Sequence, residues 1–215
     1  DKAEFEDALK KLKDSGVEWP IYVRQNKPST EYYTWMPFVA SFGGDYMNRE
    51  TGLCTGTLDG DNTIASFDFL AKLFTDGYAD ATCDYEDSFQ KGENALALYG
   101  HSKYQDYKAA LGDDLILVPL PDMGHGVYTC SGSTVMIMTT GAQESGNDDA
   151  VWAMLQEATN PDYIKMVVDV NGAVPARSSV MDAIPDYCEG GTLYLYRQQL
   201  ESGISFLRPY TPAHM

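Results

Sequence analysis

Short apolar runs alternate with amphipathic helical patterns along most of the 215-residue chain, and this alternation limits the fold more than any other feature. Runs of the kind found in buried strands occupy residues 20–24, 95–99, 115–118 and 135–138. Helical patterns, several of them ended by glycine or begun by proline, occupy residues 3–15, 31–42, 63–76, 84–91, 103–111, 148–159 and 161–170. Strands that alternate with helices in this way indicate an α/β fold.

The charge of the chain excludes several classes of partner. There are 32 acidic and 15 basic residues, which give a formal net charge of −17. Nucleic acids and anionic membrane surfaces bind clustered Lys and Arg, so neither is expected as a partner. No apolar run among these residues is long enough to span a membrane, and none has the pattern of a signal peptide. Because Asp1 already stands inside a helical pattern, we expect an excerpt of a longer protein.

The stretch LYGHSKY, residues 98–104, raises the question of a nucleophilic serine. A strand followed by Gly-x-Ser and a helix is typical of α/β hydrolases, but their turn needs a glycine where Tyr104 stands. A histidine must also follow in the chain. His125 comes too soon after the serine, and His214 is next to the last residue. An α/β hydrolase using Ser102 is therefore the alternative reading, and no catalytic residue is expected.

The sequence predicts neither a metal site nor a cofactor. Residues 59–62, Asp-Gly-Asp-Asn, begin like a calcium loop, but Ile64 and Leu70 stand where the loop needs Gly and Glu. The three histidines show no ligand spacing. A pair of carboxylates suited to glycoside hydrolysis stays open, because only their separation in space can test it.

Four cysteines are widely spaced along the chain, at Cys54, Cys83, Cys130 and Cys188. They form no Cys-x-x-Cys pair, which argues against a zinc ribbon. Four cysteines allow two disulfides with three connectivities. In a chain of this size we expect free, partly buried thiols instead.

Aromatic residues are concentrated in residues 19–46, where eight occur within 28 positions, more than one amphipathic face requires. Within this segment Glu31 directly precedes Tyr32 and Tyr33. A carboxylate accepts hydrogen bonds from hydroxyl groups, and an aromatic face stacks on the C–H face of a sugar ring. The segment therefore predicts a site for a sugar-like ligand. The alternative is that Tyr33 and Trp35 only pack the helix.

Several stretches follow one another in the order typical of a single family. They are residues 12–16 at the end of a helix, the aromatic segment Glu31 to Phe42 with Gly43-Gly44, the helix 67–76 with Gly77, FQKGENALALYG at 89–100, VPLP at 118–121, Ser131-Gly132, NGAVPAR at 171–177 and Arg208-Pro209. Together they resemble the extracellular solute-binding proteins of bacterial carbohydrate ABC importers, the maltose-binding-protein-like family. The resemblance spans nearly all of the chain.

The resemblance implies a type II periplasmic-binding-protein-like fold, in which two α/β lobes joined by hinge strands close over a ligand. Residues 1–128 would form the larger, C-terminal-type lobe, residues 129–176 would cross to the other lobe, and residues 177–215 would return. The family has a further lobe-sized segment before this start and more helices after the Arg-Pro pair. We therefore expect mostly one lobe, with part of the other missing.

The resemblance also implies ligand-binding residues. Glu31, Tyr32 and Tyr33 fall where the family has a ligand-contact stretch, and Trp35 belongs to the same segment.

After its Gly-ended strand, the family usually carries a Trp that stacks on sugar, and Ser102 stands at that position here. His101, Ser102 or Tyr104 would contact the ligand instead. Gly132 in the hinge crossing and Arg177 after the Gly-x-x-Pro turn are the last candidates.

By resemblance, the chain is a non-enzymatic receptor without a cofactor. It would bind a sugar, an oligosaccharide by preference, in an interlobe cleft and deliver it to an ABC transporter permease. We expect a monomer, extracellular or periplasmic, that is lipid-anchored in the full-length protein. The identity, length and linkage of the sugar do not follow from the sequence, and a non-sugar solute is an alternative ligand.

Overall fold

The structure is a computed structural model that describes residues 1–24, 28–82 and 87–208, residues 28–31 by their backbone alone. The chain divides into two compact units. Unit 1 comprises Asp1–Ser131 and Gln199–Met215, and unit 2 comprises Gly132–Gln198. Each unit has its own helices and its own buried residues. No helix among the described residues is long and apolar enough to cross a membrane.

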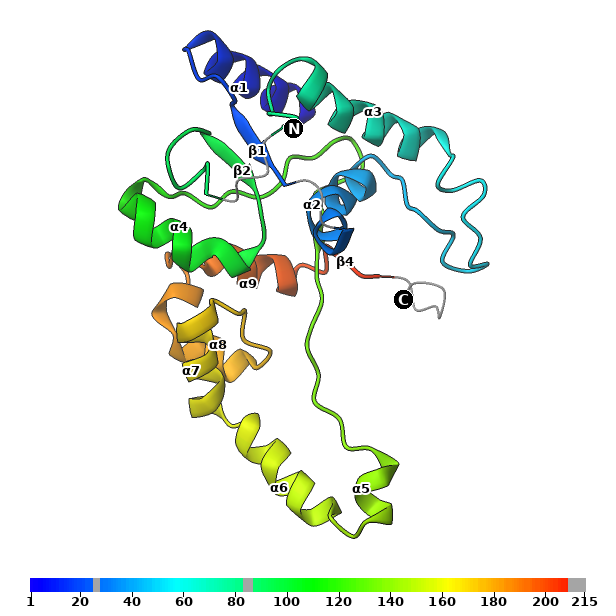
Figure 1. Cartoon of the computed structure of the whole chain (residues 1–215), viewed down its shortest axis with the longest axis vertical. Coiled ribbons are helices and arrows are strands. Elements are labelled where there is room, and N and C mark those ends of the chain that lie inside the picture. Colours follow the sequence, from blue (N-terminus) through cyan, green and yellow to red (C-terminus); the bar gives the residue numbers. More distant parts are fainter. Residues whose placement is uncertain (25–27, 83–86, 209–215) are drawn as a thin grey trace. The chain divides into compact units, whose positions relative to one another are not determined.

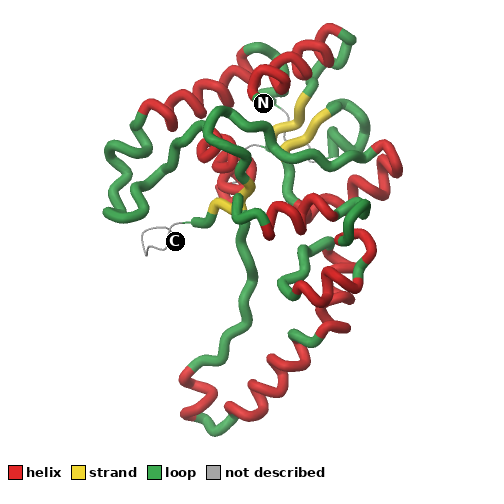
Figure 2. Tube along the Cα trace, turned by 180° about the vertical axis from the view of Figure 1, so that it is seen from behind, coloured by secondary structure: helices red, strands yellow, loops and turns green. Residues whose placement is uncertain are grey.

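A short parallel sheet stands at the centre of unit 1. Strand β1 (Ile21–Val23) pairs with β2 (Leu96–Leu98), with Ile21 opposite Leu96 and Val23 opposite Leu98. The two strands lie side by side in yellow in Figure 2. All three residues of β1 are buried, which fits the continuous apolar run in the sequence. Because the strands are parallel, the chain leaves both of them at the same edge of the sheet.

Helices surround this sheet where amphipathic patterns predicted them. The helices of unit 1, labelled in Figure 1, include α1 (Lys2–Asp14), α2 (Pro28–Ser41), α3 (Asp61–Thr75) and α4 (Tyr104–Leu111), with the 3-10 turns η1 (His101–Lys103) and η2 (Gly112–Asp114). Helix α1 begins with a capping box, in which the Asp1 carboxylate accepts from the backbone of Glu4 and the Glu4 side chain returns to the N-terminus. Such a cap satisfies donors that the first helical turn leaves unpaired.

The main core of unit 1 joins these helices to the β1–β2 sheet. Its buried residues are Leu9, Ile21, Val23, Phe38, Phe69, Leu70, Leu73, Ala79, Leu98 and Met123. Phe38 of α2 stacks on Phe69 of α3 with ring centroids 6.2 Å apart, and Phe5 of α1 lies 6.2 Å from both rings. Burial of these side chains supplies the main stabilising free energy of the unit.

A second parallel pair brings the end of the described chain back to α2. Strand β3 (Thr129–Cys130) pairs with β4 (Ser205–Phe206), and α2 packs against both strands. Buried residues of α2 on this side are Tyr32, Met36 and Val39, with Tyr46, Cys130 and Phe206 packed against them. Helix α2 is therefore buried on two sides, by the main core and by this smaller cluster.

The close approach between α2 and α3 depends on a glycine. Gly44 follows α2, and a Cβ atom at this position would lie 2.6 Å from Thr63 Oγ1 and 2.9 Å from Thr63 Cα. The Thr63 hydroxyl lies within hydrogen-bonding distance of the Thr57 and Asp45 carbonyls, and it accepts from the Asp45 backbone N–H. A side chain on Gly44 would therefore push directly into the start of α3.

Unit 2 is helical. It contains α5 (Thr140–Glu144), α6 (Asp148–Ala158), α7 (Pro161–Asn171), α8 (Ser178–Ala183) and η3 (Pro185–Tyr187), and α9 (Tyr194–Glu201) begins in it. Helix α7 begins with the Asn160 side chain accepting from the Tyr163 backbone and ends at Gly172 in the left-handed region. Tyr187 is completely buried, and its hydroxyl donates to the Ala173 carbonyl at 3.3 Å.

Three sequence predictions of secondary structure differ from the structure. The strands predicted at 115–118 and 135–138 are wrong, because both runs are extended but form no ladder with any described residue. A strand requires a partner strand, and Val135 to Met138 stay 38–72% exposed instead. The helix predicted at 84–91 lies partly outside the described residues, and residues 87–92 are turns.

Candidate ligand-binding site

The carboxyl edge of the β1–β2 sheet carries polar and aromatic side chains. Arg24 follows β1 directly and Tyr99 follows β2 directly. Arg24 Nη1 donates to the Tyr99 hydroxyl at 2.6 Å, so the two strand ends are tied together at this edge. In α/β sheets, ligands bind outside the carboxyl ends of parallel strands. Helix α2 and turn η1 are the next elements on the chain after β1 and β2, so their first residues begin from this edge.

Turn η1 presents two of the predicted site residues to solvent. His101 and Ser102 are exposed, whereas Tyr104 at the start of α4 is 7% exposed. Behind the turn, the Tyr107 ring lies edge-on to Tyr99, with centroids 5.9 Å apart. This aromatic packing fixes α4 against the end of β2, and it therefore also fixes the position of η1, which joins the two.

Ser102 lacks the partner that a nucleophile needs. Its side chain makes no hydrogen bond with any residue that the structure describes, and a serine nucleophile requires a hydrogen-bonded base. The Gly-His-Ser turn thus places two exposed polar side chains at the sheet edge without arranging them for catalysis.

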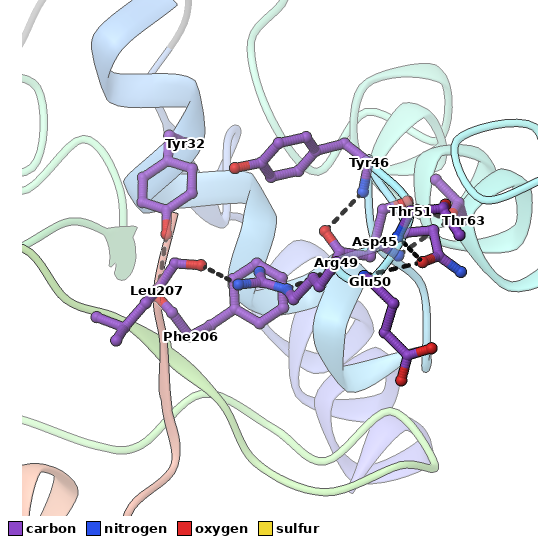
Figure 3. A network of polar contacts seen from close by, with 10 residues as sticks. Tyr32, Asp45, Tyr46, Arg49, Glu50, Thr51, Thr63, Phe206 and Leu207 are labelled. Carbon is purple, nitrogen blue, oxygen red and sulfur yellow. Dashed lines mark hydrogen bonds and ion pairs between the residues drawn. The ribbon is translucent and has the colours of Figure 1, made fainter. Parts of the chain in front are cut away.

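The neighbouring tyrosines of α2 lie in different surroundings. Tyr32 is 9% exposed, and its hydroxyl donates to the Phe206 carbonyl at 3.0 Å (Figure 3). Tyr33 is 43% exposed, and its ring lies edge-on to the Tyr32 ring at 5.2 Å. Trp35 is half-buried, edge-on to Phe67 at 6.4 Å. The side chain of Glu31 lies outside the described residues.

Two arginines that sequence analysis did not assign to the site lie beside these tyrosines. The Arg208 guanidinium stands over the rings of Tyr32 and Tyr33, at 4.6 and 5.1 Å from their centroids. The Arg49 guanidinium carbon lies 4.3 Å from the centroid of the Phe206 ring, and Figure 3 shows the two side chains against each other. The Arg-Pro motif at 208 was the available sequence signal, but it did not indicate contact with α2.

Arg49 links Asp45 to the residue that follows β4. Its Nε donates to Asp45 Oδ2 at 2.7 Å, and its Nη1 donates to the Leu207 carbonyl at 2.6 Å. Tyr32 and Arg49 thus bind the carbonyls of consecutive residues, Phe206 and Leu207, at the end of β4. These contacts position the segment that carries Arg208.

Burial keeps the tyrosine hydroxyls and the cysteine thiol beside α2 uncharged. Burial, with nearby Cys130, raises the pKa of Tyr32, and burial with the Asp45 charge raises the pKa of Tyr46 to about 12. Burial also raises the pKa of the Cys130 thiol to about 12, and this thiol donates to the Tyr32 carbonyl at 3.3 Å. The tyrosines and the thiol are therefore neutral near neutral pH, and the cations of this cluster are Arg208 and Arg49, of which Arg49 is paired with Asp45.

Cys130 is expected to resist alkylation in the folded protein, because only the thiolate reacts and its pKa is about 12. Cys54 is exposed and is expected to react readily with iodoacetamide at pH 8. Peptide mapping by mass spectrometry measures both sites, and labelling in urea is the control in which Cys130 also reacts. Equal labelling rates of Cys54 and Cys130 under native conditions would contradict the described burial.

The raised thiol pKa also sets an alkaline limit. An unfolded Cys loses its proton near pH 9, whereas folded Cys130 keeps its proton up to about 12. The free energy of unfolding is therefore unaffected by this thiol below pH 9. It falls as the pH rises from 9 toward 12, because the unfolded chain can release the Cys130 proton there and the folded chain cannot.

The remaining predicted residues lie in unit 2. Gly132 is exposed in a loop, and Arg177, also exposed, donates from Nη1 to the Thr159 carbonyl at 2.8 Å. A hollow of about 210 Å³ in this unit is lined by Met136, Trp152, Leu155, Gln156 and Thr159. Neither Gly132 nor Arg177 lines it.

A second hollow of about 410 Å³ lies in unit 1 at the start of α3, lined by Gly43, Gly44, Asp45, Gly56, Thr57, Gly60, Asp61, Asn62 and Thr63. Four of these nine residues are glycines, and the other five carry polar side chains. Within the described ranges, no group of three or more His, Cys, Asp or Glu side chains is arranged to hold a metal ion.

The fold and the family of the chain are both found among known proteins. The structure is similar to that of the sugar-binding protein MalE from the phytopathogen Xanthomonas citri, with a TM-score of 0.75 and 16% sequence identity. The similarity covers 99% of this chain and 53% of that chain, so the chain spans about half the length of this relative. The α/β, type II periplasmic-binding-protein-like fold predicted from the sequence is confirmed. Comparison with curated protein sequences found no match.

A family model described as "Bacterial extracellular solute-binding protein" matches residues 1–188. The chain belongs to this family, and the resemblance noted in the sequence is confirmed. This family is a class of extracellular or periplasmic binding proteins rather than of enzymes.

Proposed function

We propose that the chain forms part of a receptor for a carbohydrate, in which the carboxyl edge of the β1–β2 sheet contributes to the ligand site. The observation that carries the proposal is the exposed Tyr33 ring, which is supported from behind by the buried Tyr32. A tyrosine offers an apolar face for the C–H groups of a sugar and a hydroxyl for its polar groups. The structural neighbour MalE is a sugar-binding protein, which supports the same ligand class.

The predicted residues take different parts in this proposal. Tyr33 would stack on the sugar, while His101 and Ser102 would offer polar groups from η1. Tyr32 and Tyr104 are buried, so we assign them to supporting the site from behind rather than to direct contact.

Trp35 would support the same helix, since its ring packs on Phe67. Glu31, Gly132 and Arg177 stay predicted ligand contacts.

The wider mechanism is also proposed by family membership. Residues 1–128 would form the larger lobe, 129–176 would cross to the other lobe and 177–215 would return. Capture between lobes would be followed by closure and delivery of the sugar to an ABC transporter permease. The receptor would work as a monomer that is lipid-anchored to the membrane.

Isothermal titration calorimetry of the complete protein against a panel of neutral and acidic oligosaccharides tests the ligand class. We expect saturable heat with at least one sugar, and the Tyr33→Ala variant should bind that sugar about tenfold more weakly because the stacking contact is lost. Tyr163→Ala is the matched control, since Tyr163 on α7 is 41% exposed. No heat with any sugar, but heat with peptides, polyamines or metal chelates, would overturn the proposal.

A further inference from the structure

We propose that Arg208 recognises an anionic group on the sugar, so that the receptor prefers acidic carbohydrates over neutral ones. This inference rests on the proposed function and names the substrate class of the same site. The anionic group is an oxyanion, the carboxylate of a uronic acid or the phosphate of a sugar phosphate.

Arg208 has N–H donors that no described residue uses. Its guanidinium carries five N–H groups, and the contacts it makes are with the ring faces of Tyr32 and Tyr33. It forms no hydrogen bond and no ion pair with any described residue. Arg208 is also exposed. A guanidinium in this state is ready to bind an anion from solution.

The other arginines near this end of α2 are already engaged. Arg49 pairs with Asp45 and donates to the Leu207 carbonyl, and Arg24 donates to Tyr99. Among the described arginines close to α2, Arg208 is therefore the one with no N–H group bonded to another described residue.

Arg208 is also held in place before a ligand arrives. Contact with two tyrosine rings orients the planar guanidinium through cation–π interaction. The hydrogen bonds from Tyr32 and Arg49 fix the carbonyls of Phe206 and Leu207 directly before it. A pre-oriented guanidinium loses less conformational entropy on binding than a free side chain.

Arg208 and Tyr33 together are chemically complementary to a sugar that carries an anionic group. The guanidinium fork donates two parallel hydrogen bonds to a carboxylate or to phosphate oxygens. Tyr33, which touches Arg208, keeps 43% of its surface exposed for the sugar ring. An aromatic surface beside a cation matches a ligand that combines a sugar ring with an anionic substituent.

The overall charge of the chain makes this local cation necessary. With a net charge of −17, the long-range field repels anions rather than attracting them. At physiological salt this field is screened within about 8 Å, whereas a direct guanidinium contact is not. Selectivity for an acidic sugar must therefore come from a contact such as Arg208.

Calorimetry of the complete protein tests the proposal with matched ligands. Digalacturonate is compared with neutral galactobiose of the same linkage, and other acidic disaccharides with their neutral counterparts. Galactose 1-phosphate and glucose 6-phosphate form the phosphate arm. We expect an acidic or phosphorylated ligand to bind at least tenfold more tightly than its neutral counterpart, with an affinity that falls as salt rises. Tight binding in one arm alone identifies the source of the oxyanion.

Variants at Arg208 separate charge recognition from packing. Arg208→Gln should weaken binding of the anionic ligand 10- to 100-fold and change neutral-sugar binding less than threefold. Arg208→Lys keeps the charge without the fork and should recover part of the loss. Equal affinity for neutral and acidic sugars, or an equal loss of both in Arg208→Gln, would overturn this inference while the carbohydrate proposal stands. Absence of binding to every sugar would instead overturn the proposed function.

Discussion

Replacing Tyr32 with alanine is expected to lower the free energy of unfolding of unit 1 by about 3–5 kcal/mol, whereas Tyr33→Ala costs less than about 1 kcal/mol. Tyr32 is 9% exposed and packs with Met36 and Val39, so its removal leaves a cavity between α2 and the β3–β4 pair. Tyr33 is 43% exposed, and its removal leaves little empty volume. Urea unfolding followed by circular dichroism measures both variants.

The Tyr32→Phe variant is the control that separates packing from hydrogen bonding. It keeps the ring and removes only the hydroxyl that donates to the Phe206 carbonyl, so a loss of about 1 kcal/mol is expected. Tyr33→Phe should leave stability unchanged. If Tyr33→Ala destabilised the protein as much as Tyr32→Ala, the exposed ring would be a packing residue, and its proposed role in ligand binding would lose its support.

Local sequence patterns predicted the helices well because each helix buries a face that repeats within a few residues. Helix α1 was predicted at 3–15 and spans Lys2–Asp14, and α7 was predicted at 161–170 and spans Pro161–Asn171. Capping residues next to these patterns set their ends, as Asn160 and Gly172 do for α7.

Strand pairing was harder to predict because it depends on distant residues. Strands β1 and β2 lie in apolar runs that sequence analysis found, although the pairing joins residues 75 positions apart. Strands β3 and β4 have two residues each, too few for any periodic pattern. The runs at 115–118 and 135–138 have strand-like composition, yet composition alone forms no ladder.

The sequence indicated which segments could carry the candidate site, but not which of their side chains are exposed. The aromatic segment and the Gly-His-Ser turn follow the two parallel strands β1 and β2, at the edge of the sheet where ligands bind in α/β folds. The periodicity of α2 did not show which tyrosine is exposed, because this helix is covered by the main core on one side and by the β3–β4 cluster on another. Arg208 reaches Tyr32 across 176 positions, and no local pattern encodes that contact.

Replacing Gly44 with alanine is expected to destabilise unit 1 by about 3 kcal/mol, because the added methyl group collides with the Thr63 hydroxyl and also with the Thr63 backbone, which cannot turn away as a free side chain can. The new Cβ would lie 2.9 Å from Thr63 Cα and 3.0 Å from Thr63 N, so the start of α3 must move. That movement breaks the hydrogen bonds by which the Thr63 hydroxyl contacts Asp45 and Thr57. Urea unfolding of the variant gives the loss of stability.

Gly100→Ala is the matched control, because a Cβ at Gly100 has no atom within 4 Å and its φ of −90° suits any residue. This variant should unfold at the same urea concentration as the original protein. A Thr63→Ala variant removes the hydroxyl oxygen that the new Cβ would meet at 2.6 Å, so Gly44→Ala should cost less stability in this background than in the original protein only if the contact with the Thr63 side chain is the main cause. If Gly44→Ala costs the same stability in both backgrounds, the cost comes from the backbone contacts. If Gly44→Ala leaves the stability of the original protein unchanged, α2 and α3 are not packed this closely.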